Sequence, residues 1–200
     1  NFKIIKSQIP ENICLVAVSK TKPKELILEA YNLGQRHFGE NKVQELSEKA
    51  SALPKDIQWH LIGHLQTNKV KYIAEFVHLI HAVDSLKLLQ EINKQALKHN
   101  RVIACLLQFY IADEETKFGL SREEAKLLLS SESYSALQNI KIIGVMGMAS
   151  FVDDKIQIRN EFKALQAIFS EIKHNYFSDQ TSFKEVSMGM SGDFQLAIEE

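Results

Sequence analysis

Short apolar runs alternate with amphipathic stretches along most of this 200-residue chain. Most of the apolar runs are rich in Val, Ile and Leu and carry few charges, which is typical of strands buried on both faces. We expect strands at residues 14–18, 36–39, 58–62, 77–83, 102–111, 140–146 and 183–187. The stretches that follow have apolar residues at helical spacing. We expect helices at residues 23–33, 42–53, 66–76, 85–99, 121–129, 154–176 and 194–198.

Residues that favour the ends of helices lie at several of these boundaries. Pro23 suits the first turn of a helix, because its missing N–H would have no intrahelical partner there. Ser121 and Glu124 have the spacing of a capping box, and Asp153 or Asp154 can cap the longest helix. The local signals therefore agree with the hydrophobic pattern.

Strands that alternate with helices predict an α/β fold with a parallel sheet. No GxGxxG motif follows the first strand, so a dinucleotide-binding fold is not indicated. We expect a single domain, residues 1–200, with the architecture of a (β/α)8 TIM barrel. Its eighth strand is missing after Glu200, and an open barrel exposes two edges that such a strand would close. The alternative is an open, doubly wound sheet, which needs no further strand.

Lys20 is the first candidate for chemistry. It follows the apolar run at residues 14–18, in a segment that reads ICLVAVSKTKP. Reactive groups of parallel α/β folds collect at the carboxyl ends of strands. The Lys20 amine can condense with a carbonyl compound if partial burial, or a neighbouring cation such as Lys22, lowers its pKa. The alternative is an ordinary lysine in a solvated loop.

The second candidate is the turn SMGMSGD at residues 187–193, between a strand and a helix. Its glycines allow the backbone to approach a ligand, Ser191 can donate a hydrogen bond, and the helix start beyond offers free N–H groups. These features favour a phosphate-binding turn, and we expect Asp193 to cap the helix. An ordinary glycine-containing turn is the alternative. A hydrolase nucleophile elbow is disfavoured, because the final glycine of G-x-S-x-G is absent.

Composition narrows the classes of partner. The chain is 45% hydrophobic and 24% charged, with a formal net charge of -1, so we expect neither a nucleic-acid nor a membrane partner. No apolar run approaches the ~20 residues of a membrane span. Cys14 and Cys105 both lie in apolar segments, where we expect free thiols packed in the core and hence a cytoplasmic protein.

The histidines give no metal motif. His60 and His64 are four residues apart, but a strand end and Gly63 separate them, so they need not share a face. We expect His60 to be structural or to line a pocket, and the five scattered histidines elsewhere carry no prediction. Asn41 follows a strand and can either reach the mouth of the barrel or cap the next helix.

Seven segments in order carry a more specific signal: AVSKTKP, FGENKVQE, WHLIGHLQTNK, HAVDS, ETKFG, GVMGMAS and SMGMSGDFQLAI. Together they span residues 16–198 and resemble the YggS-type pyridoxal phosphate homeostasis proteins. That family has the fold of the alanine racemase N-terminal domain, a (β/α)8 barrel. It holds pyridoxal 5'-phosphate (PLP) as an aldimine with the lysine of SKTKP, which is Lys20 here.

The resemblance also implies roles for other residues of the expected site. Ser191 and Gly192 would hold the cofactor phosphate, Asn41 and His60 would lie near its ring, and Met146 would form part of the barrel wall. The family continues into a further strand whose arginine completes the phosphate site, whereas Glu200 is the last residue here.

Two further lysines are implied as second acceptors of the aldehyde: Lys22 and Lys117. Through exchange with such an amine, or with the lysine of a PLP-dependent apoenzyme, the cofactor would leave Lys20.

The function implied is that of a monomeric carrier that binds, buffers and delivers PLP, without strong turnover of its own. A PLP-dependent racemase or lyase is the alternative, but no residue is evident as its acid or base. A barrel protein that acts on a phosphorylated metabolite without any cofactor would also fit the phosphate-binding turn.

Overall fold

The computed structural model describes residues 2–112 and 119–200. Within these residues, seven strands form one parallel sheet in the order of the sequence. They are β1 (Ala17–Val18), β2 (His37–Glu40), β3 (Gln58–Leu61), β4 (Leu79–Val83), β5 (Ile103–Tyr110), β6 (Ile140–Met148) and β7 (Glu185–Ser187).

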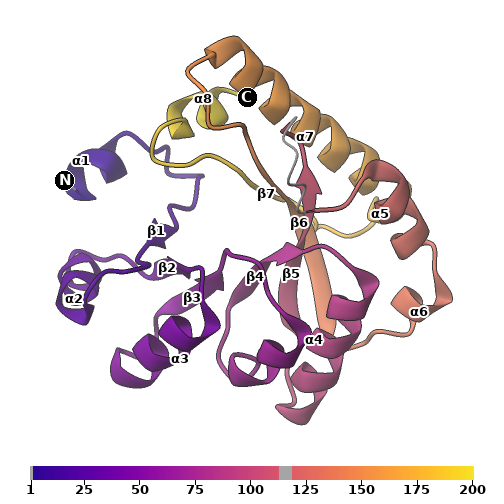
Figure 1. The fold of residues 1–200 in the computed structure, drawn as a ribbon, viewed down its shortest axis with the longest axis horizontal. Helices are drawn as coiled ribbons and strands as arrows, with labels where there is room; N and C mark the ends of the chain where they lie inside the picture. The colour runs from indigo at the N-terminus through magenta and orange to yellow at the C-terminus, as the bar shows by residue number, and fades with distance from the viewer. Residues whose placement is uncertain (1, 113–118) are drawn as a thin grey trace.

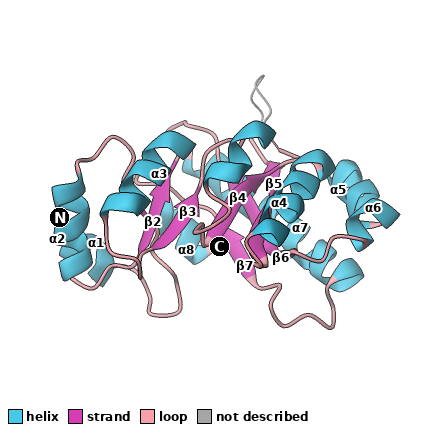
Figure 2. Ribbon diagram, turned by 90° about the horizontal axis from the view of Figure 1, so that it is seen from below, coloured by secondary structure: helices cyan, strands magenta, loops and turns pink. Residues whose placement is uncertain are grey.

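Helices precede, connect and follow these strands, and most of them cover one side of the sheet. They are α1 (Phe2–Ser7), α2 (Lys24–Asn32), α3 (Val43–Ala52), the 3-10 helix η1 (Thr67–Tyr72), α4 (Leu86–Lys98), α5 (Arg122–Leu129), α6 (Glu132–Ser135), α7 (Lys155–Tyr176) and α8 (Phe194–Glu199). Figure 1 shows the strands in an arc, with α2 to α7 on its convex side. In the view from below, α3 and α4 lie in front of the strands (Figure 2).

The sequential strand order decides between the two predicted architectures. A doubly wound sheet reverses its strand order at a switch point, whereas a barrel adds each strand next to the previous one. Here every strand pairs with its successor, and the curved sheet forms a half-barrel. The predicted TIM-barrel-like α/β fold is therefore confirmed, with β1 and β7 as the two edges of the described sheet.

Apolar side chains pack on both faces of the sheet. The larger cluster combines strand residues with helix residues such as Leu46 and Leu88, so it lies between the sheet and its helices. A smaller cluster on the other, concave face is built from strand residues alone: Leu79, Leu106 and Met146. Alternation along the strands sends successive side chains to these two faces.

The prediction that residues 14–18 form a strand buried on both faces was wrong. Only Ala17 and Val18 are in β1, and Val18 is 51% exposed. The cause is the position of β1 at the edge of the sheet, where it pairs with β2 alone. Cys14 is exposed for the same reason, whereas Cys105 is buried as expected.

Most helix boundaries follow the local signals. Ser121 and Glu124 form the capping box of α5, and the Asp154 carboxylate accepts from two backbone N–H groups at the start of α7. The helix expected at residues 66–76 is only the short 3-10 helix η1. Arg101 donates hydrogen bonds to the carbonyls of Ala74 and Val77, at 2.7 Å each, which satisfies backbone groups outside a regular helix. Helix α6 was not expected.

Within residues 2–112 and 119–200, no helix combines the length and the apolar character needed to cross a membrane.

Gly144 allows β6 and β7 to pair. A Cβ atom at this position would lie 1.8 Å from the carbonyl oxygen of Glu185, the residue opposite in register. We expect Gly144→Ala to lower the free energy of unfolding by about 1–3 kcal/mol, because the backbone of β7 must move to relieve the overlap. Urea unfolding checks this. Gly192→Ala is the matched control, since its Cβ would meet no atom within 4 Å and the stability should change little.

Candidate functional site

Lys20 lies in a tightly held turn after β1. Its neighbour Thr21 has φ of 63°, in the left-handed region that a β-branched residue seldom adopts. The Lys22 N–H donates to the Ser19 carbonyl at 3.0 Å, and the Ser19 N–H donates to the Gly39 carbonyl at 2.9 Å. Lys20 itself is exposed at the tip. The backbone of this turn is thus tied to β2, while the Lys20 side chain remains accessible.

A buried charge network supports the turn from below. The Lys49 ammonium on α3 donates to the Ser19 carbonyl and to Glu40 Oε1, both at 2.7 Å. The Ser19 hydroxyl donates to the same Glu40 oxygen at 2.6 Å. Glu45 accepts from Lys49 at 2.7 Å and from the Thr21 N–H at 2.6 Å. Two backbone groups of the Lys20 turn are therefore held by charged side chains of the neighbouring βα unit.

The network is stable as a charged unit. The side chains of Glu40 and Lys49 are only 0% and 6% exposed. Burial lowers the pKa of Lys49, but its hydrogen bonds to Glu40 and Glu45 outweigh that effect and hold the pKa above the ordinary lysine value. The pKa of Glu45 is lowered, mainly by the hydrogen bond from Lys49. Lys49 accordingly carries its positive charge throughout the neutral pH range.

Our sequence reading missed this network. Lys49 lies next to the inward residue Ala50 on the buried side of α3. A lysine within the apolar stripe of a helix, four residues after Glu45, was a signal that we did not use. Which carboxylate it would meet from another element depends on the tertiary fold.

In the turn at residues 187–193, Ser191 and Gly192 are exposed, and a hydrogen bond between Met190 and Asp193 holds the backbone around them. Gly189 has φ of +84°, and the Asp193 carboxylate accepts a hydrogen bond from the Met190 N–H. Asp193 was expected to cap α8, but its side chain makes no cap hydrogen bond there and closes the preceding turn instead. Ser191 and Gly192 are exposed at the tip, and a Cβ at Gly192 would meet no protein atom within 4 Å. Their backbone is therefore accessible to a ligand.

Asn41 and Met146 occupy different environments. Asn41 directly follows β2 and packs so closely on Gly63 that a Cβ at Gly63 would lie 2.6 Å from the Asn41 carbonyl oxygen. Helix α3 begins after Lys42 without a side-chain cap, so Asn41 does not cap it. Met146 is buried in the concave cluster, opposite Ser187 in the β6–β7 register. Of the two roles expected for Asn41, capping α3 is therefore excluded, and a position at the carboxyl end of β2 remains.

The two predicted second acceptors differ in what the structure describes. Lys22 is exposed two residues after Lys20. Lys117 lies outside the described residues.

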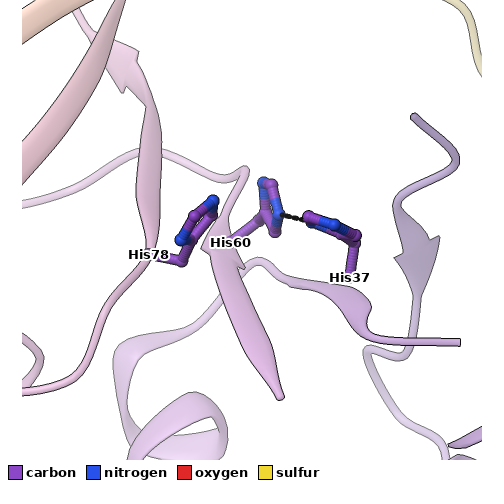
Figure 3. Close-up of side chains that lie close together, drawn as sticks. All are labelled: His37, His60 and His78. Carbon is purple, nitrogen blue, oxygen red and sulfur yellow. Dashed lines mark hydrogen bonds between the residues drawn. The ribbon is translucent and has the colours of Figure 1, made fainter. Parts of the chain in front are cut away.

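Histidines that are scattered in the sequence form a hydrogen-bonded row on neighbouring strands. Ser187 Oγ lies 2.8 Å from His81 Nδ1. His81 Nε2 lies 2.8 Å from His60 Nδ1, and His60 Nε2 lies 2.9 Å from His37 Nδ1 (Figure 3). The ring of His78 packs beside those of His37 and His60, at 5.7 and 5.3 Å between centroids. The sequence carried no prediction for His37, His78 and His81, and it is the pairing of parallel strands that brings them side by side with His60.

The row is uncharged at neutral pH. Burial, together with the neighbouring imidazoles, lowers the pKa of His60 to about 2 and that of His81 to about 3. A neutral imidazole donates with one nitrogen and accepts with the other. The two bonds of His60 therefore run in one direction along the row.

Comparison with known proteins gives the family. The profile of the alanine racemase N-terminal domain matches residues 1–200. A pyridoxal phosphate homeostasis protein of Aquifex aeolicus is 41% identical over 187 residues, which is 93% of this chain and 80% of the relative. The human protein of that name is 40% identical over 197 residues, covering 92% of this chain and 70% of the relative. The chain belongs to the pyridoxal phosphate homeostasis protein family.

Solved structures agree with this family. PipY of Synechococcus elongatus, solved without PLP, superposes with a TM-score of 0.91 at 34% identity, covering 99% of this chain and 91% of PipY. PipY with PLP bound gives a TM-score of 0.87 at the same identity and coverage. An alanine racemase of Clostridium difficile gives 0.72 at 14% identity, over 96% of this chain and 51% of the racemase, which shows the fold alone.

Proposed function

We propose that this protein binds PLP through Lys20 and serves PLP homeostasis by holding and delivering the cofactor. The observation that carries the proposal is the Lys20 turn, in which an accessible amine stands on a backbone anchored by Gly39, Glu45 and Lys49. The relatives named for PLP homeostasis and the PLP-bound structure of PipY support the choice of ligand.

The residues at the carboxyl ends of the strands suit the parts of this ligand. PLP supplies a reactive aldehyde, an aromatic ring and a phosphate. The Lys20 amine is the group that attacks the aldehyde. The hydroxyl of Ser191 and the exposed backbone of Gly192 bind the phosphate, with no side chain in the way. Asn41 contacts the ring region, while Met146 belongs to the apolar wall. The place of His60 near the ring stays a prediction.

A rigid turn suits a carrier. Holding the Lys20 backbone in place lowers the ordering cost of binding, because hydrogen bonds already fix this part of the chain. Because the Lys20 side chain is exposed, an amine of another molecule can reach the same carbon of the ligand. Delivery to an apoenzyme then requires only that its lysine replace Lys20. Lys22 and Lys117 remain the proposed acceptors within the chain.

The proposed delivery is tested by reactivation of an apoenzyme. Full-length protein loaded with PLP is mixed with a PLP-dependent apoenzyme, and the recovery of enzyme activity is compared with that given by free PLP at the same concentration. We expect the loaded protein to sustain recovery and the Lys20→Ala variant, treated identically, to carry less cofactor into the mixture. Equal transfer by both would contradict the proposal.

The competing function is amino-acid racemisation. A racemase exchanges the Cα proton of its amino acid with solvent, so proton NMR in D2O distinguishes the two. We expect no loss of the Cα signal of alanine at stoichiometric protein over the time of the transfer experiment. A substrate-level loss that requires Lys20 would favour the enzyme. If no visible absorbance develops on adding PLP, a phosphorylated metabolite becomes the better ligand.

Ser191 gives a prediction about the phosphate. Ser191→Ala removes a hydroxyl that donates to a charged oxygen, a bond of about 1.5–3 kcal/mol, so we expect PLP to bind about 10- to 100-fold more weakly. Absorbance titration measures this. Pyridoxal, which lacks the phosphate, is the matched ligand control, and its affinity should not change. Equal weakening for both ligands would show that Ser191 acts on the fold and not on the phosphate.

We also propose that the protein is a cytoplasmic monomer whose partners are PLP-dependent apoenzymes. Its two cysteines are both free thiols, which supports a reducing compartment.

A further inference from the structure

Three imidazoles converge away from the Lys20 turn and the phosphate-binding turn. His37 is the first residue of β2, His60 is in β3, and His78 directly precedes β4. One ring nitrogen from each lies within 4.8 Å of the others, and Figure 3 shows the His60 ring between those of His78 and His37. His37 and His78 stand at the amino ends of their strands, whereas Lys20 and Ser191 follow the carboxyl ends of β1 and β7. Two of the three histidines thus lie at the strand ends opposite those that carry Lys20 and Ser191, while His60 is the residue also predicted near the PLP ring.

The distance between two of these ring nitrogens is close to the distance between ligand nitrogens around a bound metal ion. Nitrogens bound to zinc at 2.0–2.1 Å in a tetrahedral arrangement lie about 3.3 Å apart. His37 Nδ1 and His60 Nε2 are now 2.9 Å apart and share one proton. Replacing that proton by a cation requires these nitrogens to separate by only a few tenths of an ångström. His78 has to approach the pair, which its exposed position allows.

His81 is positioned to orient His60 as a metal ligand. A histidine that ligates through one nitrogen usually donates its other N–H to a fixed partner, which orients the ring. His60 Nδ1 already pairs with His81 Nε2 at 2.8 Å, and His81 Nδ1 pairs with Ser187 Oγ at 2.8 Å. With His60 Nε2 on the ion, His60 donates to His81 and His81 donates to Ser187. Both buried imidazoles then remain fully hydrogen-bonded.

Exposure and charge are compatible with an ion that enters from solvent. His60 is buried, His37 is half-buried and His78 is exposed, so the cluster is open on one side. The Arg101 guanidinium acts electrostatically on His78 and opposes a second positive charge there. This repulsion weakens the site but acts on the exposed ligand only.

We propose that His37, His60 and His78 bind a divalent transition-metal ion, with Zn2+ as the representative ion and water in the remaining coordination position. Three neutral nitrogens favour Zn2+ and its first-row neighbours over Mg2+ and Ca2+, which prefer oxygen ligands. The site goes beyond the proposed PLP function and does not depend on it.

The test uses untagged full-length protein, treated with a chelator and then titrated with Co2+ and Zn2+ in the absence of PLP. Isothermal titration calorimetry gives the Zn2+ affinity, and the visible d–d absorption of Co2+ reports a low-symmetry site with nitrogen ligands. We expect one ion per chain. His37→Ala and His78→Ala should each weaken Zn2+ binding at least about 10-fold, the least that loss of a supporting partner costs at such sites.

His174→Ala is the matched control, because His174 is exposed on α7 and lies outside the cluster. It should bind Zn2+ like the unchanged protein. Far-UV circular dichroism verifies that the two test variants fold, which their positions at strand ends permit. Absence of the Co2+ band at one equivalent, or Zn2+ binding that both test variants retain in full, would overturn the proposal. Because PLP is omitted, failure here leaves the Lys20 assignment untouched, and the converse also holds.

Discussion

Lys20→Ala is expected to abolish the principal adduct that borohydride forms between this protein and PLP. The alanine has no amine to attack the aldehyde, so nothing at this position can be reduced to a stable bond. The measurement is incubation of full-length protein with PLP, borohydride reduction, and peptide mass spectrometry to locate the added mass. In the unchanged protein, we expect the modified residue to be Lys20.

Two variants sharpen this experiment. Lys22→Ala keeps the neighbouring exposed cation out of the reaction and should leave the adduct on Lys20. Lys20→Arg keeps a positive charge, but its guanidinium remains protonated and should not react. An adduct of full yield on Lys22 or Lys117 in the Lys20→Ala protein would contradict the assignment of Lys20 as the principal binding group.

Lys49→Met is expected to destabilise the protein by about 3–5 kcal/mol, because it leaves a buried carboxylate without its counter-charge. Glu40 is fully buried, and one of its oxygens, Oε2, already has no hydrogen-bond partner within the described residues. Methionine fills similar space and cannot donate to Glu40 or to the Ser19 carbonyl. Urea denaturation gives the change in the free energy of unfolding.

Lys24→Met is the control for this variant. Lys24 pairs with Glu48 at 3.0 Å on the surface, where the Glu48 side chain is 72% exposed. Exposed pairs contribute at most about 1 kcal/mol, so the control should unfold almost like the unchanged protein. We also expect Lys49→Met to slow the reaction of Lys20 with PLP, since the Ser19–Thr21 backbone loses its anchors. Equal stability of the two variants would show that the network is not needed for the fold.

Apolar patterning and capping residues in the sequence predicted the order of most strands and helices and many of their boundaries. The capping box of Ser121 and Glu124 was predicted because its two hydrogen bonds form within a single turn. The helix expected at residues 42–53 formed as α3, and its buried residues Val43, Leu46 and Ala50 have the helical spacing on which that prediction depended. Lys20 and the turn around Ser191 stood out because each directly follows an apolar run, and parallel strands direct such positions to one end of the sheet.

Contacts between distant segments were decided by the tertiary structure alone. His37 and His60 are 23 positions apart, and His81 and Ser187 are 106 apart, so no local pattern relates them. Their row exists because the strand register places these side chains next to one another across the sheet. The same holds for Lys49, whose partner Glu40 belongs to another element.

Exposure at the sheet edge likewise depended on the whole fold. An apolar sequence before Ser19 is compatible with a central or an edge strand, and only the pairing of β1 with β2 alone leaves Val18 and Cys14 exposed. The sequence by itself determined most of the segments that become strands and helices and the position of Lys20 directly after the first strand. The tertiary structure determined which buried polar groups meet, because hydrogen bonds and ion pairs require atoms within about 3 Å that only the folded chain brings together.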